Sequence, residues 1–232
     1  MSSESEQIVL VVGASRGIGL ALVQELSARP NTQALASVRE PNVALDAIKG
    51  VKTITLDISD DDSVVHAASD VPELDTIIIN AGMGKRDPVT TTSTAELAKY
   101  LNVNVLGPHR VIRAFLPALR ARKTRKIITI SSSSGSIGQQ ALPGSTGLAG
   151  SYGVSKAACN MLAVQCNKEL QDEGFTVVPI HPGWVATDMG NAHGPGGMPP
   201  ATSAKAILQL VDNLTTKDSA TFFKFDGEKM PW

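Results

Sequence analysis

Short apolar runs rich in Val and Ile alternate with helical patterns from one end of the chain to the other. The apolar runs are continuous and do not alternate with polar residues, which indicates burial on both faces and therefore a parallel sheet covered by helices. Alternation over the full length is typical of a doubly wound α/β fold with about seven strands and helices on both faces. We predict strands within 7–14, 32–39, 51–58, 74–82, 126–132, 175–183 and 220–225.

Length and charge limit what this fold is used for. A chain of 232 residues suits one sizeable core, so we predict a single domain spanning 1–232. A formal net charge of -1 does not call for nucleic acid or an anionic membrane as a partner. The most basic run, 120–126, follows a long amphipathic helical pattern at 95–122. We expect it to complement the negative end of that helix and stay solvated.

The cysteines, the histidines and the N-terminus each exclude a class of protein. Cys159 and Cys166 lie within one helix predicted over 152–171, where a disulfide is geometrically disfavoured, so we predict buried thiols in a reducing compartment. The four histidines form no set with ligand spacing, so we predict no metal site. The N-terminus lacks an apolar signal core and no apolar run is long enough to span a bilayer. We therefore expect a cytoplasmic protein.

A glycine-rich turn joins the first predicted strand to the first predicted helix. Gly13, Gly17 and Gly19 have the spacing G-x-x-x-G-x-G. Glycines here permit a tight turn and let backbone N–H groups approach a pyrophosphate at the start of a helix. Many strand-to-helix turns need a glycine, but the position after a buried strand favours phosphate binding.

The second predicted strand ends at a basic residue. An acid at this position in dinucleotide-binding folds takes the ribose 2′-OH of NAD, whereas an arginine favours the 2′-phosphate of NADP. The sequence has Arg39 here, and Arg16 in the glycine turn offers a second guanidinium for a phosphate. Glu40 could instead hold an arginine in a surface pair. We predict NADP(H) as the cofactor.

Seven motifs in one order resemble those of the short-chain dehydrogenase/reductase family, and together they cover nearly the whole chain. They are GASRGIG (13–19), LDI (56–58), NAG (80–82), NVNVLG (102–107), ISSSSG (130–135), YGVSK (152–156) and HPGWVATD (181–188). The resemblance implies a Rossmann fold that binds a nicotinamide cofactor and exchanges hydride with a carbonyl group. It implies cofactor contacts from Gly13, Ser15, Arg16, Gly17, Ile18, Gly19, Arg39, Asp57, Ile58, Asn80, Ala81, Gly82, Tyr152, Lys156, Pro182, Gly183, Val185 and Thr187.

Within that set the resemblance assigns parts of the cofactor to segments. Asp57 and the Ile58 backbone would contact the adenine, although a strand-end aspartate also commonly caps the next turn. Asn80, Ala81 and Gly82 would line the adenine ribose side. The segment 182–187 would hold the carboxamide end of the nicotinamide.

Tyr152 and Lys156 lie one turn apart on one face of a predicted helix. A free tyrosine titrates at about pH 10, and a neighbouring ammonium group favours its phenolate form, which brings it closer to the working range of a general acid–base catalyst. The resemblance makes Tyr152 the general acid/base, with Lys156 tuning it and holding the nicotinamide ribose. The alternative is an exposed pair without a function.

Two further members of the catalytic set are less distinct in the sequence. By analogy Ser132 hydrogen-bonds the substrate carbonyl, but its three serine neighbours, Ser131, Ser133 and Ser134, compete, and alternation along a strand leaves every second one facing the site. The resemblance makes Asn104 the residue that holds a helix bend and a water linking the lysine to solvent. Asn102 would point elsewhere. We interpret His181 as a packed strand-end residue.

Two Gly/Pro/Ser-rich loops, near 134–150 and 188–201, would build the substrate pocket. Compact size, these loops and the ending FDGEKMPW resemble the C-factor and sniffer-like carbonyl reductases and the norsolorinic-acid-type ketoreductases of fungi. We predict an NADPH-dependent reductase of a small-molecule ketone or aldehyde, including a secondary-metabolite ketoreductase, that forms a homodimer or homotetramer through its two long helices. The alternatives are a catalytically silent cofactor-sensing or scaffold protein, which the complete catalytic set disfavours, and an NAD-dependent alcohol dehydrogenase, which Arg39 disfavours.

Overall fold

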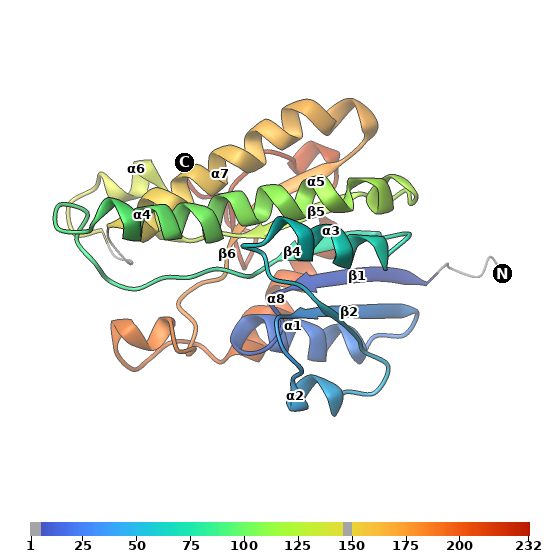
Figure 1. The fold of residues 1–232 in the computed structure, drawn as a ribbon. Helices are drawn as coiled ribbons and strands as arrows, with labels where there is room; N and C mark the ends of the chain where they lie inside the picture. The colour runs from blue at the N-terminus through green and yellow to red at the C-terminus, as the bar shows by residue number, and fades with distance from the viewer. Residues whose placement is uncertain (1–5, 146–149) are drawn as a thin grey trace.

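A computed structural model describes residues 6–145 and 150–232 and shows one seven-stranded sheet whose strands are all parallel (Figure 1). The strand order is β3-β2-β1-β4-β5-β6-β7, so the chain reverses direction across the sheet between β3 and β4. This confirms the predicted doubly wound α/β fold. The strands are β1 (Gln7–Val12), β2 (Thr32–Val38), β3 (Lys52–Thr55), β4 (Thr76–Ile79), β5 (Lys126–Ile130), β6 (Thr176–His181) and β7 (Phe223–Lys224).

Helices cover both faces of the sheet, as Figure 1 shows. Successive residues of β1 enter opposite cores: Leu10 packs with α3, α5 and α7, and Val11 packs with α1, α2 and α8. Both are fully buried, which explains why the strand is apolar at every position. The helices are α1 (Gly17–Ser27), α2 (Val43–Asp46), α3 (Asp61–Ser69), α4 (Thr94–Leu101), α5 (Gly107–Arg120), α6 (Ile137–Gln140), α7 (Ser151–Leu170) and α8 (Pro200–Asn213).

The amphipathic stretch at 95–122 is interrupted. A π-helical segment, Asn102–Leu106, separates α4 from α5, and the Gly107 N–H donates to the Asn102 carbonyl five residues earlier. A Cβ on Gly107 would lie 2.6 Å from Ile58 Cγ1, so only glycine lets α5 begin this close to the end of β3. The extra residue in this turn changes which side chains face inward.

The basic run 120–126 does complement the end of α5, because Arg125 donates to the Arg120 and Arg122 carbonyls. The expectation that the whole run stays solvated is wrong, because other members of the run are paired. Arg122 contacts Asp75 at 2.9 Å and Glu73 at 3.3 Å. Lys126 Nζ donates to the Val211 carbonyl at 2.6 Å, and burial lowers the pKa of this amine. The carboxylates that hold the run come from turns distant in sequence, so its charge is used to tie the amino ends of β4 and β5 to their neighbours.

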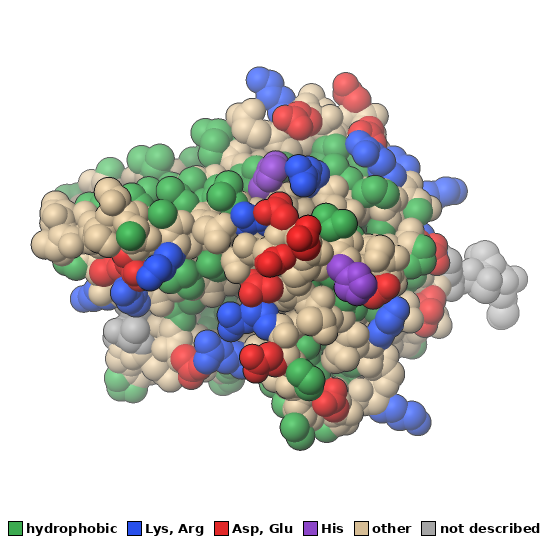
Figure 2. Space-filling model, in the orientation of Figure 1, with side chains coloured by type: hydrophobic (Ala, Val, Ile, Leu, Met, Phe, Trp, Pro, Cys, Tyr) green, Lys and Arg blue, Asp and Glu red, His purple; other side chains and the backbone are tan. Residues whose placement is uncertain are grey.

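The remaining surface carries both charged and hydrophobic side chains, and the two cysteines lie in α7 as predicted. Figure 2 shows charged side chains of both signs interspersed over one face, and hydrophobic side chains gathered beside α4 and α7. Exposed Val154 and Met161 lie on α7. Cys159 is buried and Cys166 half-buried in α7, and both are unpaired thiols. Within the described part of the chain, no helix is both long and apolar enough to cross a membrane.

Candidate active site

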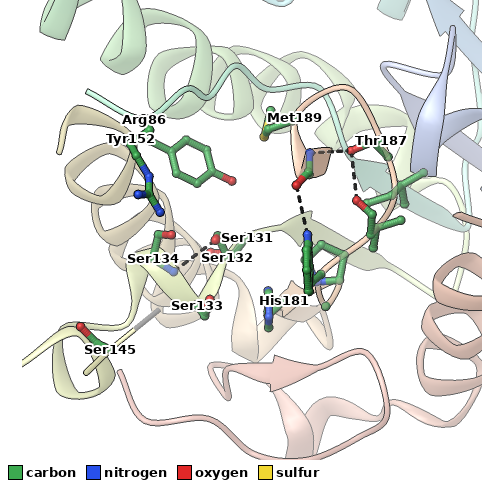
Figure 3. A pocket seen from close by; sticks show the side chains of 16 residues that line it. Arg86, Ser131, Ser132, Ser133, Ser134, Ser145, Tyr152, His181, Thr187 and Met189 are labelled. Carbon is green, nitrogen blue, oxygen red and sulfur yellow. Dashed lines mark hydrogen bonds between the residues drawn. The ribbon is translucent and has the colours of Figure 1, made fainter. Parts of the chain in front are cut away.

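A cleft of about 550 Å³ lies at the carboxyl ends of β5 and β6 (Figure 3). Three segments that are distant in sequence form most of it: the serines that follow β5, the first turn of α7, and the loop that follows β6. Ile18 of α1 and Arg86, which lies between β4 and α4, complete the wall. Ligands of open α/β sheets bind at this edge. Its walls are Ile18, Arg86, Ser131, Ser132, Ser133, Ser134, Ser145, Tyr152, His181, Pro182, Gly183, Trp184, Val185, Thr187, Met189 and Gly190.

Tyr152 and Lys156 lie on one face of α7, as predicted, and both are buried, with 6% and 5% of their surface exposed. The Lys156 ammonium lies 5.8 Å from the centre of the Tyr152 ring and donates to the Ile130 carbonyl at 2.7 Å. A Cβ on Gly135 would lie 2.6 Å from the Lys156 carbonyl carbon, so the glycine lets the turn after β5 pack directly on α7. The pair is therefore not a solvated surface pair.

Asn104 is held in the π-helical segment by three hydrogen bonds and is 1% exposed. Its Nδ2 donates to the Met83 carbonyl at 2.8 Å and to Ser155 Oγ at 2.9 Å, and its Oδ1 accepts from the Met83 N–H at 2.9 Å. Ser155 Oγ in turn donates to the Tyr152 carbonyl at 2.8 Å. We call Asn104, Tyr152, Ser155 and Lys156 the catalytic corner.

The NAG motif (80–82), which follows β4, borders this corner. A Cβ on Gly82 would lie 3.2 Å from Asn104 Oδ1 and 3.5 Å from Lys156 Nζ. Asn104 and Lys156 therefore face the same small space, although α7 and the π-helical segment are far apart in sequence. Asn102 points elsewhere, because its Oδ1 accepts from Arg110 Nη1 at 2.9 Å.

The four serines after Ile130 have different partners. Ser131 Oγ donates to Asn160 Oδ1 of α7 at 2.5 Å and is thereby occupied. Ser132 Oγ accepts from the Ser134 N–H at 3.1 Å, which leaves its own hydroxyl proton for a group in the cleft. Ser134 Oγ is buried and has no partner among the described residues, and Ser133 only lines the wall.

The glycine turn meets the fourth strand at very close range. A Cβ on Gly19 would collide with the Gly13 carbonyl oxygen, and one on Gly13 would lie 2.7 Å from Ala81 Cα. Asn80 Nδ2 donates to the Gly13 carbonyl at 2.8 Å. Helix α1 begins at Gly17, and no side chain caps its N-terminus. Its first N–H groups are thus available to a phosphate, which fits the pyrophosphate of a dinucleotide.

The carboxyl ends of β2 and β3 are followed by the groups predicted for the adenosine, which lie outside the cleft wall. Exposed Arg39 makes no ion pair within the described residues, and neither does Glu40. Asp57 Oδ1 accepts from the N–H and hydroxyl of Ser59 at 2.8 and 2.6 Å, so the strand-end aspartate does cap its turn. These hydrogen bonds lower the pKa of Asp57, and the charge of Arg39 lowers it further. Asp57 Oδ2 has no such bond.

Arg16 is paired with an aspartate of the loop that follows β6. Its Nη1 contacts Asp188 Oδ2 at 2.6 Å, with 79% and 76% of the two side chains exposed. The pair joins the glycine turn to the loop after β6. Of the other predicted residues of this region, Ser15 is exposed with its carbonyl accepting from Asn42 Nδ2 at 3.1 Å, and buried Ile58 packs on α5.

The loop after β6 folds back against the glycine turn. A Cβ on Gly17 would lie 3.0 Å from Thr187 Cγ2, so the two predicted cofactor segments are in contact. Gly183 has a φ of +83°, and any Cβ there would lie 2.7 Å from Met198 Cε. Pro182 accepts from Ser203 Oγ at 2.7 Å and Val185 is buried, which anchors this segment to α8 and the core.

His181 forms part of the cleft wall as well as the end of β6. Burial, with a smaller contribution from the charge of Lys224, lowers the pKa of its imidazole to about 4. The side chain is therefore neutral at pH 7. Its Nδ1 is buried and has no partner within the described chain.

Several cleft or corner residues were absent from the predicted site residues, among them Ser155, Met189 and Arg86. Ser155 stands three positions after Tyr152, so helical periodicity alone places it on the same face. Met189 and Arg86 come from irregular segments, where no periodicity indicates orientation. The predicted substrate loop near 134–150 lies partly outside the described residues, and both it and the 188–201 loop contribute to the cleft wall.

The chain is similar to known oxidoreductases over nearly its whole length. The sequence model of the family described as short chain dehydrogenase matches residues 7–196. An uncharacterised oxidoreductase of Schizosaccharomyces pombe is 34% identical over 98% of this chain and 99% of its own. The crystal structure of NADPH-bound carbonyl reductase from chicken fatty liver superposes with a TM-score of 0.89 at 30% identity, covering 100% of this chain and 96% of that one.

A second solved structure agrees with the subgroup that the sequence motifs indicated. Carbonyl reductase Sniffer of Drosophila melanogaster superposes with a TM-score of 0.87 at 27% identity, covering 99% of this chain and 100% of that one. The similarity to this family thus extends across the sheet, the glycine turn and the buried Tyr152–Lys156 pair. The chain is an oxidoreductase that belongs to the short-chain dehydrogenase family.

Proposed function

We propose that this chain is an NADPH-dependent reductase of ketones or aldehydes, with residues 1–232 acting as one catalytic unit. The observation that carries the proposal is the catalytic corner: buried Tyr152 lines a cleft of about 550 Å³, and buried Lys156, held by the Ile130 carbonyl, lies one helical turn behind it. Ser132 lies on the same cleft wall. A proton donor and a hydrogen-bond donor on one wall are what reduction of a carbonyl group requires.

The residues present fit a dinucleotide. The uncapped start of α1 and the glycine turn would hold the pyrophosphate, and Thr187 would lie beside it at the nicotinamide end. The unpaired guanidinium of Arg39 beside Asp57 supports a 2′-phosphate, because an arginine fork binds phosphate through parallel hydrogen bonds. When bound, NADPH supplies hydride to the carbonyl carbon. The chicken enzyme, which resembles this chain, binds NADPH.

In the proposed mechanism each residue of the corner has a separate task. The Ser132 hydroxyl donates a hydrogen bond to the substrate oxygen, and the Tyr152 hydroxyl gives its proton to the alkoxide as it forms. The Lys156 ammonium stabilises the resulting phenolate. Asn104 and Ser155 hold the π-helical segment against α7, so that the donor atoms need no reorganisation during the reaction.

Two experiments test this function. In the first, NADPH and NADH are titrated into the purified protein in parallel, and we expect tight binding of NADPH and weaker binding of NADH. In the second, Tyr152→Phe is assayed with NADPH and a panel of neutral ketones and aldehydes. We expect kcat to fall about 10²- to 10⁴-fold, the usual contribution of general acid–base catalysis, with NADPH affinity unchanged.

The other tyrosine provides a matched control. Tyr100→Phe removes a hydroxyl that donates to Asp87 Oδ2 at 3.4 Å and is not part of the cleft wall, so turnover should stay within about twofold. Retained turnover in Tyr152→Phe contradicts the mechanism. Binding of neither cofactor contradicts the reductase function and favours a silent scaffold on this fold, whereas preference for NADH contradicts only the role of Arg39.

A further inference from the structure

One cleft residue has no role in the proposed chemistry. Arg86 lies on the cleft wall, in the irregular segment between β4 and α4, and Figure 3 shows it beside Tyr152. Its guanidinium makes no hydrogen bond or ion pair within residues 6–145 and 150–232. An arginine without a partner at the mouth of a cleft is a candidate ligand for an anion.

The backbone on both sides of Arg86 is fixed against the start of α7. A Cβ on Gly84 would lie 2.8 Å from the Tyr152 ring, so the glycine lets the chain pass directly over the tyrosine. Asp87 pairs with Gly150, whose φ is +79° and whose missing Cβ leaves room for the Asp87 carbonyl oxygen. The position of Arg86 relative to the tyrosine is thus set by two close contacts.

The neighbouring charges are neutralised among themselves and leave Arg86 out. Lys85 Nζ contacts Glu96 at 3.1 Å and Asp87 at 3.9 Å, and the Asp87 carboxylate also accepts from Tyr100. The acid next to Arg86 in sequence is therefore turned toward other groups.

The cleft as a whole carries one formal charge. No aspartate or glutamate stands among its sixteen wall residues, and His181 is neutral because its pKa is lowered to about 4. Arg86 is then the charged side chain of the wall within the described part of the protein. A ligand with one negative charge would complement this cleft, whereas a cation would be repelled.

We infer that Arg86 is a specificity-determining residue that selects ketones or aldehydes carrying a carboxylate group, an inference that rests on the proposed reductase function. The carboxylate accepts two parallel hydrogen bonds from the guanidinium, and the carbonyl group extends inward to Tyr152 and Ser132. A carboxylate is the planar anion that matches the guanidinium fork. The substrate class is therefore oxo acids whose carboxylate and carbonyl group are separated by a short spacer.

The test compares two substrates of the same shape and different charge. Carboxybenzaldehydes and nitrobenzaldehydes, substituted at the meta or para position, place either a carboxylate or a neutral nitro group at the same distance from the aldehyde. Both are assayed with NADPH in wild type, in Arg86→Gln, and in Arg113→Gln as a control. Arg113 of α5 is also exposed, makes no ion pair within the described residues, and lies outside the cleft wall.

We expect Arg86→Gln to lower kcat/KM about tenfold for the carboxylate and less than twofold for the nitro compound, with the loss appearing in KM. Arg86→Lys should recover part of the loss because it keeps the charge but not the fork. Arg113→Gln should leave the ratio unchanged. A binding measurement that needs no turnover accompanies it: benzoate titrated into the NADP⁺ complex should bind about tenfold more weakly to Arg86→Gln, and benzamide equally to both.

The outcomes separate this inference from the proposed function. Equal losses for both substrates in Arg86→Gln, or an unchanged ratio, overturn the role of Arg86 while turnover of the nitro compound still supports a reductase. Benzoate binding that depends on Arg86, in a protein that reduces no aldehyde, supports the anion site and overturns the reductase.

Discussion

The catalytic corner and the adenosine end of the predicted cofactor site, which we define as Arg16, Arg39 and Asp57, differ in how their polar groups are paired. The buried side chains of Asn104 and Lys156 each bond to another part of the chain. At the adenosine end Arg39 is exposed and has no ion pair within the described chain. Under the proposed function, the corner must hold its atoms in place before a substrate arrives, and the adenosine end must keep a charge available for a ligand.

This difference determines what a substitution should cost. Removing a partner in the corner leaves another buried group unsatisfied, so folding and catalysis are lost together. Removing an exposed charge at the adenosine end leaves no protein group behind, so only ligand affinity changes. Measurements of unfolding and of cofactor binding on the same variants therefore separate the two regions.

The largest effect is expected in the corner. Asn104→Leu removes three hydrogen bonds and leaves both backbone groups of Met83 and the Ser155 hydroxyl without this partner. At about 1–3 kcal/mol for each buried group left unsatisfied, we expect a loss of roughly 3–5 kcal/mol of unfolding free energy, together with loss of turnover. Urea unfolding measures the first quantity.

Asn102 supplies the control for that variant. It is also an asparagine of the π-helical segment, but it is half-buried and bonded to Arg110 at 2.9 Å. Asn102→Leu should cost about 1 kcal/mol. Equal losses of unfolding free energy at the two positions would show that the hydrogen bonds of the corner contribute no more to stability than those of the surrounding helix.

His181 tests the comparison at an intermediate point, because its side chain is half-buried in the cleft wall and its buried Nδ1 has no partner within the described chain. Its pKa is lowered from 6.5 to about 4, so between these values the unfolded chain takes up a proton that the folded chain refuses. Its contribution to stability is complete above about pH 6.5 and is lost as the pH falls toward 4.

We therefore expect wild type to lose about 2 kcal/mol more stability than His181→Asn when the pH is lowered from 7 to about 4.5. Urea unfolding at the two pH values gives this difference, in which the titration of the common carboxylates cancels. Parallel pH dependence in the two proteins would mean that the imidazole is hydrated and not shielded by the wall.

At the adenosine end, Arg39→Gln should raise the Kd for NADPH about tenfold or more, because a charge-assisted pair of hydrogen bonds to the phosphate is lost. The Kd for NADH and the free energy of unfolding should not change measurably, since Arg39 holds no other residue by an ion pair. Glu40→Gln is the neighbouring control. A loss of NADH affinity in Arg39→Gln would show a structural contribution that the comparison denies.

Sequence patterns predicted the parts of this molecule that depend on local composition. Buried parallel strands must be apolar at every position, so Ile77, Ile78 and Ile79 mark β4 without further information. The pairing of Tyr152 with Lys156 follows from helical periodicity. Prediction ended where sequence-distant contacts decide the outcome.

Three features show what those contacts do. The break between α4 and α5 depends on Gly107 packing against Ile58. Ser131, and not one of its neighbours, is held by the protein because its hydroxyl donates to Asn160 of α7. The basic run that we expected to be solvated is held by Asp75 and other acids from elsewhere in the chain. Periodicity within one segment does not indicate which distant segment it will contact. The sequence therefore left the choice among the serines open and gave the wrong surroundings for the basic run.

The ion pair between Arg16 and Asp188 sharpens the comparison with the smallest expected effect. Both side chains are mostly exposed, so Asp188→Asn should change the unfolding free energy by less than about 0.5 kcal/mol. In the structure Asp188 pairs with the Arg16 guanidinium, which the sequence offered as a second ligand of the phosphate. If Arg16 must leave Asp188 to reach the phosphate, Asp188→Asn should bind NADPH a few-fold more tightly, most clearly at low salt, because exposed charges are screened as ionic strength rises.

NADH lacks the 2′-phosphate, so its affinity should be the same in wild type and Asp188→Asn. Adding Arg16→Gln to Asp188→Asn should abolish the gain, which a double-mutant cycle on NADPH binding measures directly. An unchanged Kd for NADPH in Asp188→Asn would mean that Arg16 serves the loop after β6 and not the cofactor. The adenosine end would then depend on Arg39 for its selectivity between NADPH and NADH. The exposed guanidinium of Arg39 would be the one group there to compare with the buried hydrogen bonds of the catalytic corner.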